Sequence, residues 1–373
     1  MSKSLSILAL NWRDLCNPEA GGAEVNIFRQ ARHWVEQGHK VTLLCADPGR
    51  RYAPQRNEVI DGIMVRRMGN KFSVYLLALI YYWRHITSFD IIIDVSNGIP
   101  FFSPLLARTP GILLVHHVHG KQWFTEFPRP IADLGWFLER KVVRLVYRGW
   151  PVIAVSPTTR DALLALGFPP SQVSVVYNGV DMPAEVPVAN PDGKPRIAYV
   201  GRMKQYKRIN LLVVAVAGLR RRFPDIHLDL AGDGDALPEI KALIEQLKLQ
   251  DHVSIHGYVD ARKKAEILSA ATVFATPSAQ EGWGLSVIEA NAFGCPAVAF
   301  DVPGLSVAIR DGETGLLASD EAGFEAALAL ILSDRETRSR YSKAARAWAA
   351  GFTWERSAVE TLRLVSEKWN LPA

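Results

Sequence analysis

The sequence predicts an α/β protein with two doubly wound domains, each a parallel sheet with helices on both faces. Short, continuously apolar runs alternate with helical patterns along the chain, and such runs are typical of strands buried on both faces. A proline-rich stretch without periodicity, 181–195, separates two series of these runs. With 373 residues, of which 49% are hydrophobic and 22% charged, the chain is long enough to bury two cores.

Each series contains several expected strands bounded by Gly, Pro or Asp. A helix is expected at 23–36, because Ile27, Ala31 and Trp34 recur at helical spacing and Gly38 follows. We expect strands at 5–10, 40–45, 91–93, 112–115 and 152–155 in the first series, and at 196–200, 226–231, 253–256, 272–275 and 297–300 in the second.

These elements define the expected domains. We place an N-terminal domain at 1–180 and a C-terminal domain at 196–352, joined by the exposed linker 181–195. A final helix at about 353–373 is expected to pack back on the N-terminal domain.

The amino-acid composition argues against some kinds of site, but it does not identify the binding partner. The formal net charge of +5 favours an anion, and a nucleotide, a phospholipid surface and a nucleic acid all meet that condition. The three cysteines form no C-x-x-C pair, so neither a disulfide framework nor a structural zinc site is expected. The apolar runs at 1–10 and 72–83 are too short for a spanning helix of roughly 20 residues. We therefore expect no signal peptide, no spanning helix and a cytoplasmic location.

The first candidate site follows the first strand, where open α/β sheets bind ligands. Gly21 and Gly22 precede the first helix, so the backbone can approach a phosphate closely and the helix N–H groups favour an anion. The alternative is that these glycines only shape a turn.

The second candidate site is G-R-M-K-Q-Y-K, which follows the first strand of the second series. Arg202 and Lys207 can neutralise a diphosphate leaving group and so do the work of a metal ion. The alternative is a solvated basic turn.

The third candidate site is E-G-W-G-L-S-V-I-E, at 281–289. Gly282 and Gly284 permit a tight loop before an apolar-faced helix. Glu281 and Glu289 are then too far apart to share a proton, but they suit hydrogen bonds to two sets of hydroxyls. The alternative is an exposed pair of carboxylates near a helix end.

Taken together, these motifs resemble the retaining, family 4 glycosyltransferases of GT-B fold, over nearly the whole chain. That fold has two Rossmann-like domains facing a central cleft, an N-terminal acceptor-side domain and a C-terminal domain that binds a nucleotide sugar. The resemblance rests on G-G-A-E at 21–24, the His after 112–115, A-V-S at 154–156, N-G-V-D at 178–181, G-R-x4-K at 201–207, A-G-D-G at 231–234, H-G-Y-V at 256–259 and the E-x7-E block at 281–289.

The resemblance implies roles for matching residues. The donor diphosphate would be held by Gly21, Gly22, Gly201, Arg202 and Lys207. The transferred sugar would contact Glu281, assisted by the backbone of Trp283, Gly284 and Leu285, and the ribose would contact Glu289. The nucleobase would lie against His256, Tyr258 and Val259, largely through main-chain groups.

A histidine at the end of the strand 112–115 is implied to lie near the transferred sugar. The register favours His116, but His117 remains an alternative. Glu24, His117, His119 and Trp123 are further acceptor-side candidates. A metal site in the His run is disfavoured, because neighbouring side chains on a strand point to opposite faces. We interpret Asp233-Gly234-Asp235 as a glycine-rich turn rather than a divalent-metal motif.

The expected reaction is a retaining, metal-independent transfer from a UDP- or GDP-sugar to a glycan or lipid-linked glycan, in cell-surface polysaccharide, lipopolysaccharide or glycolipid synthesis. A front-face displacement is expected, because no protein nucleophile is evident. The alternatives are a sugar-nucleotide epimerase of GT-B fold, glycosylation of a small molecule, and a nonenzymatic sugar-binding module. No nucleic-acid partner is expected, because the basic run at 220–222 suits the end of a helix predicted at 211–222.

Two apolar segments of the first domain favour peripheral contact with an anionic membrane at its inner, cytoplasmic face. Aromatic and basic residues are mixed over 123–150, and the apolar run at 72–83 lies in the same domain. An aromatic core with a basic solvent face explains 123–150 nearly as well.

Overall fold

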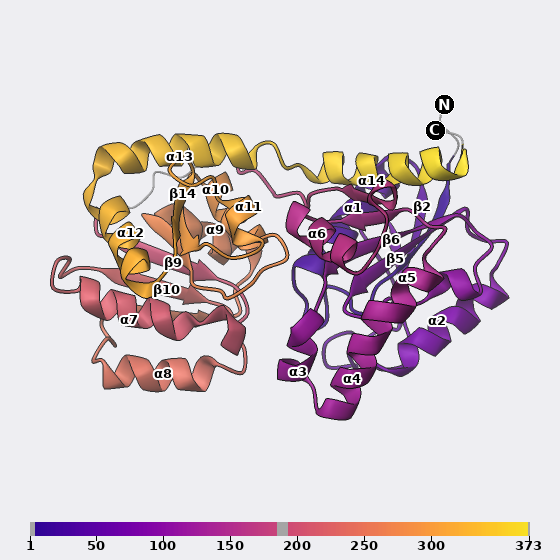
Figure 1. Ribbon diagram of the computed structural model, residues 1–373, viewed down its shortest axis with the longest axis horizontal. Helices are drawn as coiled ribbons and strands as arrows, with labels where there is room; N and C mark the ends of the chain where they lie inside the picture. The colour runs from indigo at the N-terminus through magenta and orange to yellow at the C-terminus, as the bar shows by residue number, and fades with distance from the viewer. Residues whose placement is uncertain (1–3, 185–192, 372–373) are drawn as a thin grey trace. The chain divides into compact units, whose positions relative to one another are not determined.

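The computed structural model describes residues 4–184 and 193–371, and it divides into two compact units (Figure 1). Unit 1 comprises Met1–Gly179 with Thr353–Ala373, and unit 2 comprises Val180–Phe352. The central part of the expected linker, 185–192, lies outside the described residues.

Unit 1 is built on an eight-stranded sheet in the order β3-β4-β2-β1-β5-β6-β7-β8. The pairing is parallel throughout except between β3 and β4. The strands are β1 (Ser6–Leu10), β2 (Lys40–Cys45), β3 (Asn57–Ile60), β4 (Ile63–Arg67), β5 (Ile91–Asn97), β6 (Gly111–His117), β7 (Val152–Ala154) and β8 (Val173–Val175).

Helices cover both faces of this sheet. On one face α1 packs beside α14, where Trp34 and Val365 are buried and the Trp34 Nε1 donates to the Ala358 carbonyl at 3.0 Å. On the other face Val74 and Tyr147 are buried against the strands. The helices of unit 1 are α1 (Gly22–Glu36), α2 (Ser73–Arg84), η1 (Ser103–Leu105), η2 (Gly120–Gln122), α3 (Trp123–Glu126), α4 (Arg129–Phe137), the π-helical η3 (Leu138–Val142), α5 (Val143–Val146), α6 (Pro157–Ala165), η4 (Pro170–Gln172) and α14 (Trp354–Trp369).

Unit 2 is built on a six-stranded, wholly parallel sheet in the order β11-β10-β9-β12-β13-β14, and its central strands β12 and β13 are buried on both faces. The strands are β9 (Arg196–Val200), β10 (His227–Ala231), β11 (Val253–Gly257), β12 (Val273–Thr276), β13 (Ala297–Phe300) and β14 (Gly315–Ala318). The helices are η5 (Gln205–Lys207), α7 (Ile209–Leu219), α8 (Leu237–Gln246), α9 (Ala261–Ala270), α10 (Leu285–Ala292), α11 (Leu305–Ala308), α12 (Glu321–Ser333) and α13 (Arg335–Ala349).

The predicted α/β class with parallel sheets is confirmed, and each predicted strand is present. The sequence analysis missed β3, β4, β8 and β14. The β3–β4 hairpin had a usable signal, because Asp61 and Gly62 both take the positive φ that a tight hairpin turn requires, 49° and 79°. The helix predicted at 211–222 runs instead over Ile209–Leu219. Among the described residues, no helix has the length and apolarity needed to cross a bilayer.

Candidate functional site

Two loops meet in unit 2 because the strands that precede them, β9 and β12, are neighbours in the sheet. From the first loop, Arg208 donates through Nε to the Pro277 carbonyl at 2.9 Å and through Nη2 to the Ser278 carbonyl at 3.3 Å. These bonds hold the carboxyl end of β9 against the turn after β12. They bring Lys207 beside Glu281, 74 residues further along the chain.

The Lys207 ammonium and the Glu281 carboxylate form a short ion pair. The same oxygen, Glu281 Oε1, accepts from the Ser278 hydroxyl at 2.7 Å. The two charged side chains are only 12% and 15% exposed, so their charges are screened less than those of a surface pair. Two of the residues predicted to act on the donor therefore lie in direct contact.

Arg202 lies at the start of the same loop, next to Gly201, whose N–H donates to the Ala231 carbonyl at 3.0 Å. The Tyr199 hydroxyl donates to the Arg202 carbonyl at 3.0 Å and so fixes the backbone there. The Arg202 side chain is exposed and makes no ion pair within the described chain. Its guanidinium donors remain available to an anionic ligand.

The A-G-D-G turn packs against this loop through its backbone. A Cβ atom on Gly232 would lie 1.9 Å from the Gly201 carbonyl oxygen, so the close approach requires glycine. Asp233 Oδ1 accepts the next residue's N–H at 2.7 Å, and Asp235 pairs with Lys204 at 2.8 Å. Over residues 4–184 and 193–371, no group of three or more His, Cys, Asp or Glu side chains is arranged to hold a metal ion.

The E-x7-E block forms the loop after β12 and the start of α10. Gly284 is the N-cap residue in the left-handed region, with φ 77°, and Leu285 begins the helix. The Trp283 side chain is buried, so it is not available to a ligand. Glu289, about one helical turn after Leu285, is partly exposed and pairs with Lys264 of α9 at 2.7 Å.

The residues predicted to meet the nucleobase lie at the end of the edge strand β11 and in the turn that follows it. His256 is turned to the sheet, where its Nε2 lies 2.8 Å from the Asp229 carboxylate, which also pairs with Arg196 at 3.2 Å. Tyr258 is 86% exposed in the turn after the strand, and Val259 is half-buried. The histidine side chain is thus engaged within the protein, whereas Tyr258 is exposed to solvent.

In unit 1, the predicted glycine pair begins α1. Gly21 is the N-cap residue and Gly22 the first residue of the helix. The Glu24 carboxylate accepts the Gly21 N–H at 2.7 Å and is buried. Glu24 therefore caps the helix, and its acceptor-side role remains a prediction.

The loop between β1 and α1 is held by a buried ion pair that the sequence analysis missed. Arg67, at the end of β4, donates through Nε to Asp14 at 2.6 Å and through Nη1 to Glu58 at 2.8 Å. Burial opposes the guanidinium charge, but these hydrogen bonds hold the pKa of Arg67 above its ordinary value. No local pattern could reveal a pair whose members are 53 residues apart.

His116 lies where β6 loses its regular register with β5. Ser96 pairs with Val115 and Asn97 pairs with His117, so His116 is the extra residue of a bulge. Its side chain is buried, its Nε2 has no hydrogen-bond partner within the described residues, and burial lowers its pKa to about 3. The imidazole is therefore neutral at ordinary pH.

The two other candidate histidines are occupied by the loop after β6. The His117 Nε2 lies 2.6 Å from the Gln122 side-chain oxygen. The His119 ring stacks on Trp123 with a centroid separation of 4.8 Å, and Trp123 is buried. The rings of His117 and His119 are thus held by neighbouring side chains, whereas His116 has a buried Nε2 without a hydrogen-bond partner within the described residues.

This loop is fixed by Glu139, another residue the sequence analysis missed. Its carboxylate accepts from the N–H groups of His119 and Gly120 at 2.7 and 2.8 Å and from the Trp123 Nε1 at 3.2 Å. Burial raises the pKa of Glu139, although these donors oppose the rise. Glu139 lies on the π-helical turn η3, and such turns are frequent at functional sites.

Both units match known family models. The Glycosyltransferase Family 4 model matches residues 20–182, and the Glycosyl transferases group 1 model matches residues 184–348. The chain belongs to these glycosyltransferases. The predicted family and the predicted GT-B fold are confirmed.

Curated relatives of this glycosyltransferase carry several names. The D-inositol 3-phosphate glycosyltransferase of Corynebacterium diphtheriae is 36% identical over 96% of the chain and 93% of the relative. The enzyme of that name from Nocardia farcinica is 35% identical, but there the match spans 62% of this chain and only 54% of the relative. The alpha-D-kanosaminyltransferase of Streptomyces kanamyceticus is 27% identical over 67% of the chain and 69% of the relative.

Solved structures share the fold of this glycosyltransferase at low sequence identity. Anabaena HepE in complex with UDP and glucose has a TM-score of 0.78 and 18% identity, covering 97% of this chain and 100% of that one. The sucrose-phosphate synthase of Thermosynechococcus elongatus has a TM-score of 0.80 and 21% identity, covering 98% and 99%.

Proposed function

We propose that this glycosyltransferase moves a sugar from a nucleotide diphosphate sugar to an acceptor hydroxyl with retained anomeric configuration and without a metal ion. The observation that carries the proposal is the contact between Lys207 and Glu281, which joins the two loops at the carboxyl ends of β9 and β12. A fixed cation beside a fixed carboxylate suits a diphosphate next to sugar hydroxyls.

In the proposed step, the bond from the anomeric carbon to the diphosphate oxygen breaks, and a bond to the acceptor oxygen forms on the same face. The acceptor's proton passes to the departing diphosphate. Arg202 and Lys207, with the N–H groups at the start of α10, stabilise the charge that develops on this leaving group. The Asp233 and Asp235 carboxylates are engaged by the backbone and by Lys204, which supports a metal-free mechanism.

The remaining roles follow the same assignment. Glu281 contacts the transferred sugar, Glu289 contacts the ribose, and the main chain at 256–259 lies against the base. His116 is the histidine that meets the transferred sugar, through a neutral imidazole whose Nε2 can bond a hydroxyl. The donor is a UDP- or GDP-sugar, and the UDP complex of the structurally similar HepE supports UDP.

For the acceptor, we propose a glycan or lipid-linked glycan of the cell surface, reached by peripheral contact with an anionic membrane from the cytoplasmic side. A second candidate is a small phosphorylated polyol, favoured by the D-inositol 3-phosphate glycosyltransferases among the relatives. An epimerase would differ from both by converting the donor when no acceptor is present.

The substitution Arg202→Ala tests the proposal. UDP-, GDP- and ADP-sugars are first screened for thermal stabilisation, because a ligand that binds only the folded protein raises its melting temperature. With the donor identified, we expect Arg202→Ala to lower kcat by about 10²-fold or more, because one donor to the developing charge is lost. The variant Arg340→Ala, on the exposed face of α13, serves as control. Activity should survive EDTA, and loss of activity on chelation contradicts the metal-free mechanism.

A further inference from the structure

The outer face of α2 is apolar although it is exposed. Phe72, Leu76, Ile80 and Trp83 recur at helical spacing and are 68%, 64%, 36% and 67% exposed. The inner face of the helix, including Val74, is buried against the sheet. A helix on a protein surface normally presents polar residues outward, so this stripe is an exposed apolar patch that calls for a partner.

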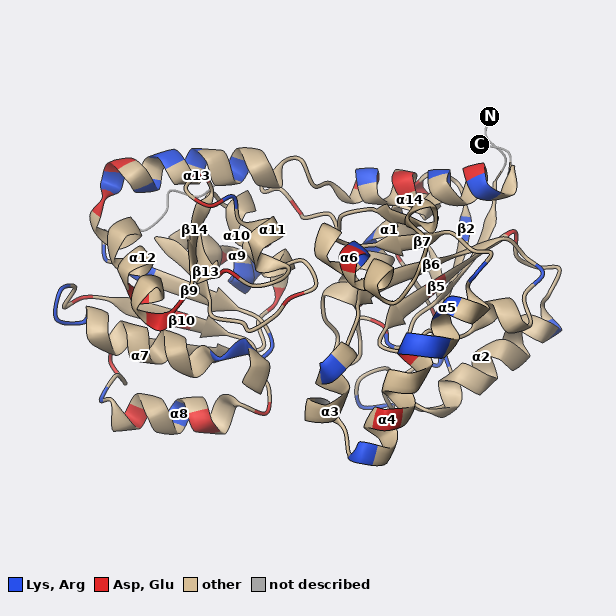
Figure 2. Ribbon diagram, viewed as in Figure 1, with Lys and Arg blue, Asp and Glu red and all other residues tan. Residues whose placement is uncertain are grey.

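Within the sequence that surrounds this stripe, 62–89, the formal charges are all positive. Lys71 precedes α2, Arg84 ends it, and the stretch 62–89 contains no Asp or Glu. Lys71 and Arg84 are exposed and make no ion pair in the part of the chain that the structure describes. Figure 2 shows α2 uncharged along most of its length. An apolar stripe with cations at its ends matches the interface of an anionic bilayer.

The segment that follows α4 adds to this pattern. On the same face of the sheet as α2, exposed Arg140, Lys141 and Arg144 accompany exposed Phe137. Three aromatic residues of the segment 123–150, Trp123, Tyr147 and Trp150, are buried in the core. For these three residues, the structure supports the aromatic core that was the alternative to membrane contact. Those three side chains are therefore not part of an exposed apolar surface, whereas the stripe on α2 is.

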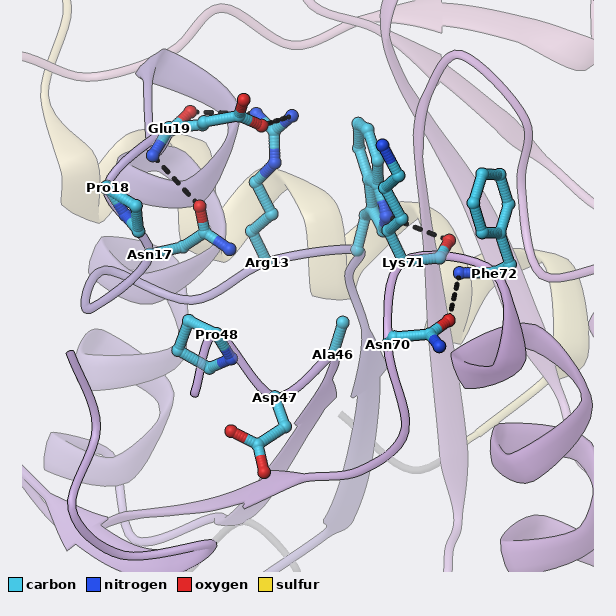
Figure 3. Close-up of a pocket in the computed structure, with 11 residues that line it drawn as sticks. Arg13, Asn17, Pro18, Glu19, Ala46, Asp47, Pro48, Asn70, Lys71 and Phe72 are labelled. Carbon is cyan, nitrogen blue, oxygen red and sulfur yellow. Dashed lines mark hydrogen bonds and ion pairs between the residues drawn. The ribbon is translucent and has the colours of Figure 1, made fainter. Parts of the chain in front are cut away.

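A pocket of about 460 Å³ opens beside the start of α2, at the carboxyl ends of β1, β2 and β4 (Figure 3). Phe72 belongs both to this pocket and to the apolar stripe. The Trp12 Nε1 donates to the Lys71 carbonyl at 3.2 Å, which ties the loop after β1 to the start of the helix. A binding partner that contacts α2 would therefore also lie at the rim of the pocket. The aromatic, amide and charged side chains of the pocket suit a polar head group.

We propose that the outer face of α2 inserts its apolar stripe into the interface of an anionic lipid bilayer, with Lys71 and Arg84 contacting lipid head groups. Membrane binding by α2 is independent of the proposed glycosyl transfer. Its function, to bring the pocket to an acceptor carried by the bilayer, rests on that proposal. The occupant of the stripe is the bilayer itself.

Vesicle co-sedimentation of the full chain tests this surface. The vesicles contain phosphatidylcholine alone or equal parts of phosphatidylcholine and phosphatidylglycerol, at low and at high salt. We expect binding to the anionic vesicles at low salt, weaker binding at high salt, and at least a tenfold lower partition coefficient for the double variant Leu76→Gln with Trp83→Gln. The control is Leu330→Gln with Val359→Gln, which replaces exposed apolar residues of α12 and α14 and should bind like the wild type.

Two results would overturn the inference: wild-type protein that stays in solution with anionic vesicles, or an α2 variant that binds as well as the wild type. If size-exclusion chromatography shows instead that the α2 variant breaks up a dimer and neither protein binds vesicles, the stripe joins two copies of the chain. Thermal stabilisation by the nucleotide sugar is measured on both proteins, because most of the proposed donor residues lie in unit 2, away from the substituted side chains. Its absence in the wild type refutes the glycosyl transfer and leaves the vesicle result to decide on α2.

Discussion

The two units handle charge in opposite ways at the ends of their strands. In unit 2, Lys207 and Glu281 carry opposite charges, are partly buried and are in contact. In unit 1, burial keeps His116 neutral and leaves its Nε2 without a partner in the described residues. This difference agrees with the proposed roles, in which unit 2 binds a charged diphosphate and unit 1 contacts uncharged sugar hydroxyls.

The two sites also differ in what holds them in place. The Lys207 loop is pinned by side-chain bonds from Arg208 to carbonyls of the neighbouring loop. The His116 side chain is set by a bulge in the sheet and by the Glu139 carboxylate, which gathers the following loop. Hydrogen bonds between two loops therefore position the cation, whereas packing in the core positions the buried ring.

Removing the cation of unit 2 should give the largest effect. We expect Lys207→Met to lower kcat by about 10²- to 10³-fold, because the charge on the leaving group loses a fixed partner. The same change leaves Glu281 with only the Ser278 hydroxyl, so the protein should also lose about 1–3 kcal/mol of stability. Steady-state kinetics and urea unfolding measure the two effects.

Lys204 provides a matched control in the same loop. It pairs with Asp235 at 2.8 Å, but both side chains are largely exposed, 40% and 62%. Lys204→Met should therefore change stability by less than about 1 kcal/mol and leave kcat within a few-fold of the wild type. Equal losses of kcat and stability in the two lysine variants would mean that burial of the Lys207 pair contributes to neither.

The parts of the fold that local patterns describe were predictable from the sequence. Continuous apolar runs identified strands such as β1 and β9, and Gly38 marked the end of the helix at 22–36, because these signals lie within one element. The strands β8 and β14 were missed although the equally short β7 and β12 were predicted, because Ser174 interrupts the apolar run of β8 and β14 begins with Gly315, a residue type typical of turns. The Asp61-Gly62 turn is typical of a β-hairpin and would have predicted β3 and β4, but the sequence analysis did not use it.

The candidate site was predictable only in its motifs. Glu281 and Lys207 stood in recognisable loops, and adjacent strands brought them together. Their partners were not predictable, because a residue such as Glu139 reaches the loop after β6 across about 20 positions with no sequence pattern. The bulge that separates His116 from its neighbours depends on sheet register, which the sequence analysis left open.

The neutral state of His116 predicts an effect of pH on stability. The folded protein holds the pKa near 3, whereas in the unfolded chain it is about 6.5, so between these values the unfolded state binds the extra proton. This contribution to stability is lost as pH falls below about 6.5. Between pH 7.5 and pH 5, the wild type should lose about 2 kcal/mol more than His116→Gln, measured by urea unfolding.

The control for this prediction is His85→Gln. His85 is exposed and lies just after α2, so its removal should leave the pH dependence of the wild type intact. If His116→Gln loses as much stability on acidification as the wild type, the imidazole is not held neutral, and the contrast between the two units disappears.

The smallest effect on activity is expected for Lys264, the ion-pair partner of Glu289. Lys264 pairs with Glu289 at 2.7 Å, but the two side chains are 31% and 23% exposed, so the pair is weak and mainly orients the carboxylate. If Glu289 holds the ribose, Lys264→Met should raise the KM for the donor a few-fold and leave kcat unchanged, because ribose binding is the same in the ground and transition states. Lys263→Met, the preceding residue, whose exposed side chain pairs with Glu266 at 3.3 Å, should change neither constant. A fall in kcat for Lys264→Met with an unchanged KM would place Glu289 at the reacting sugar instead, and both carboxylates of the block would then act at one end of the donor.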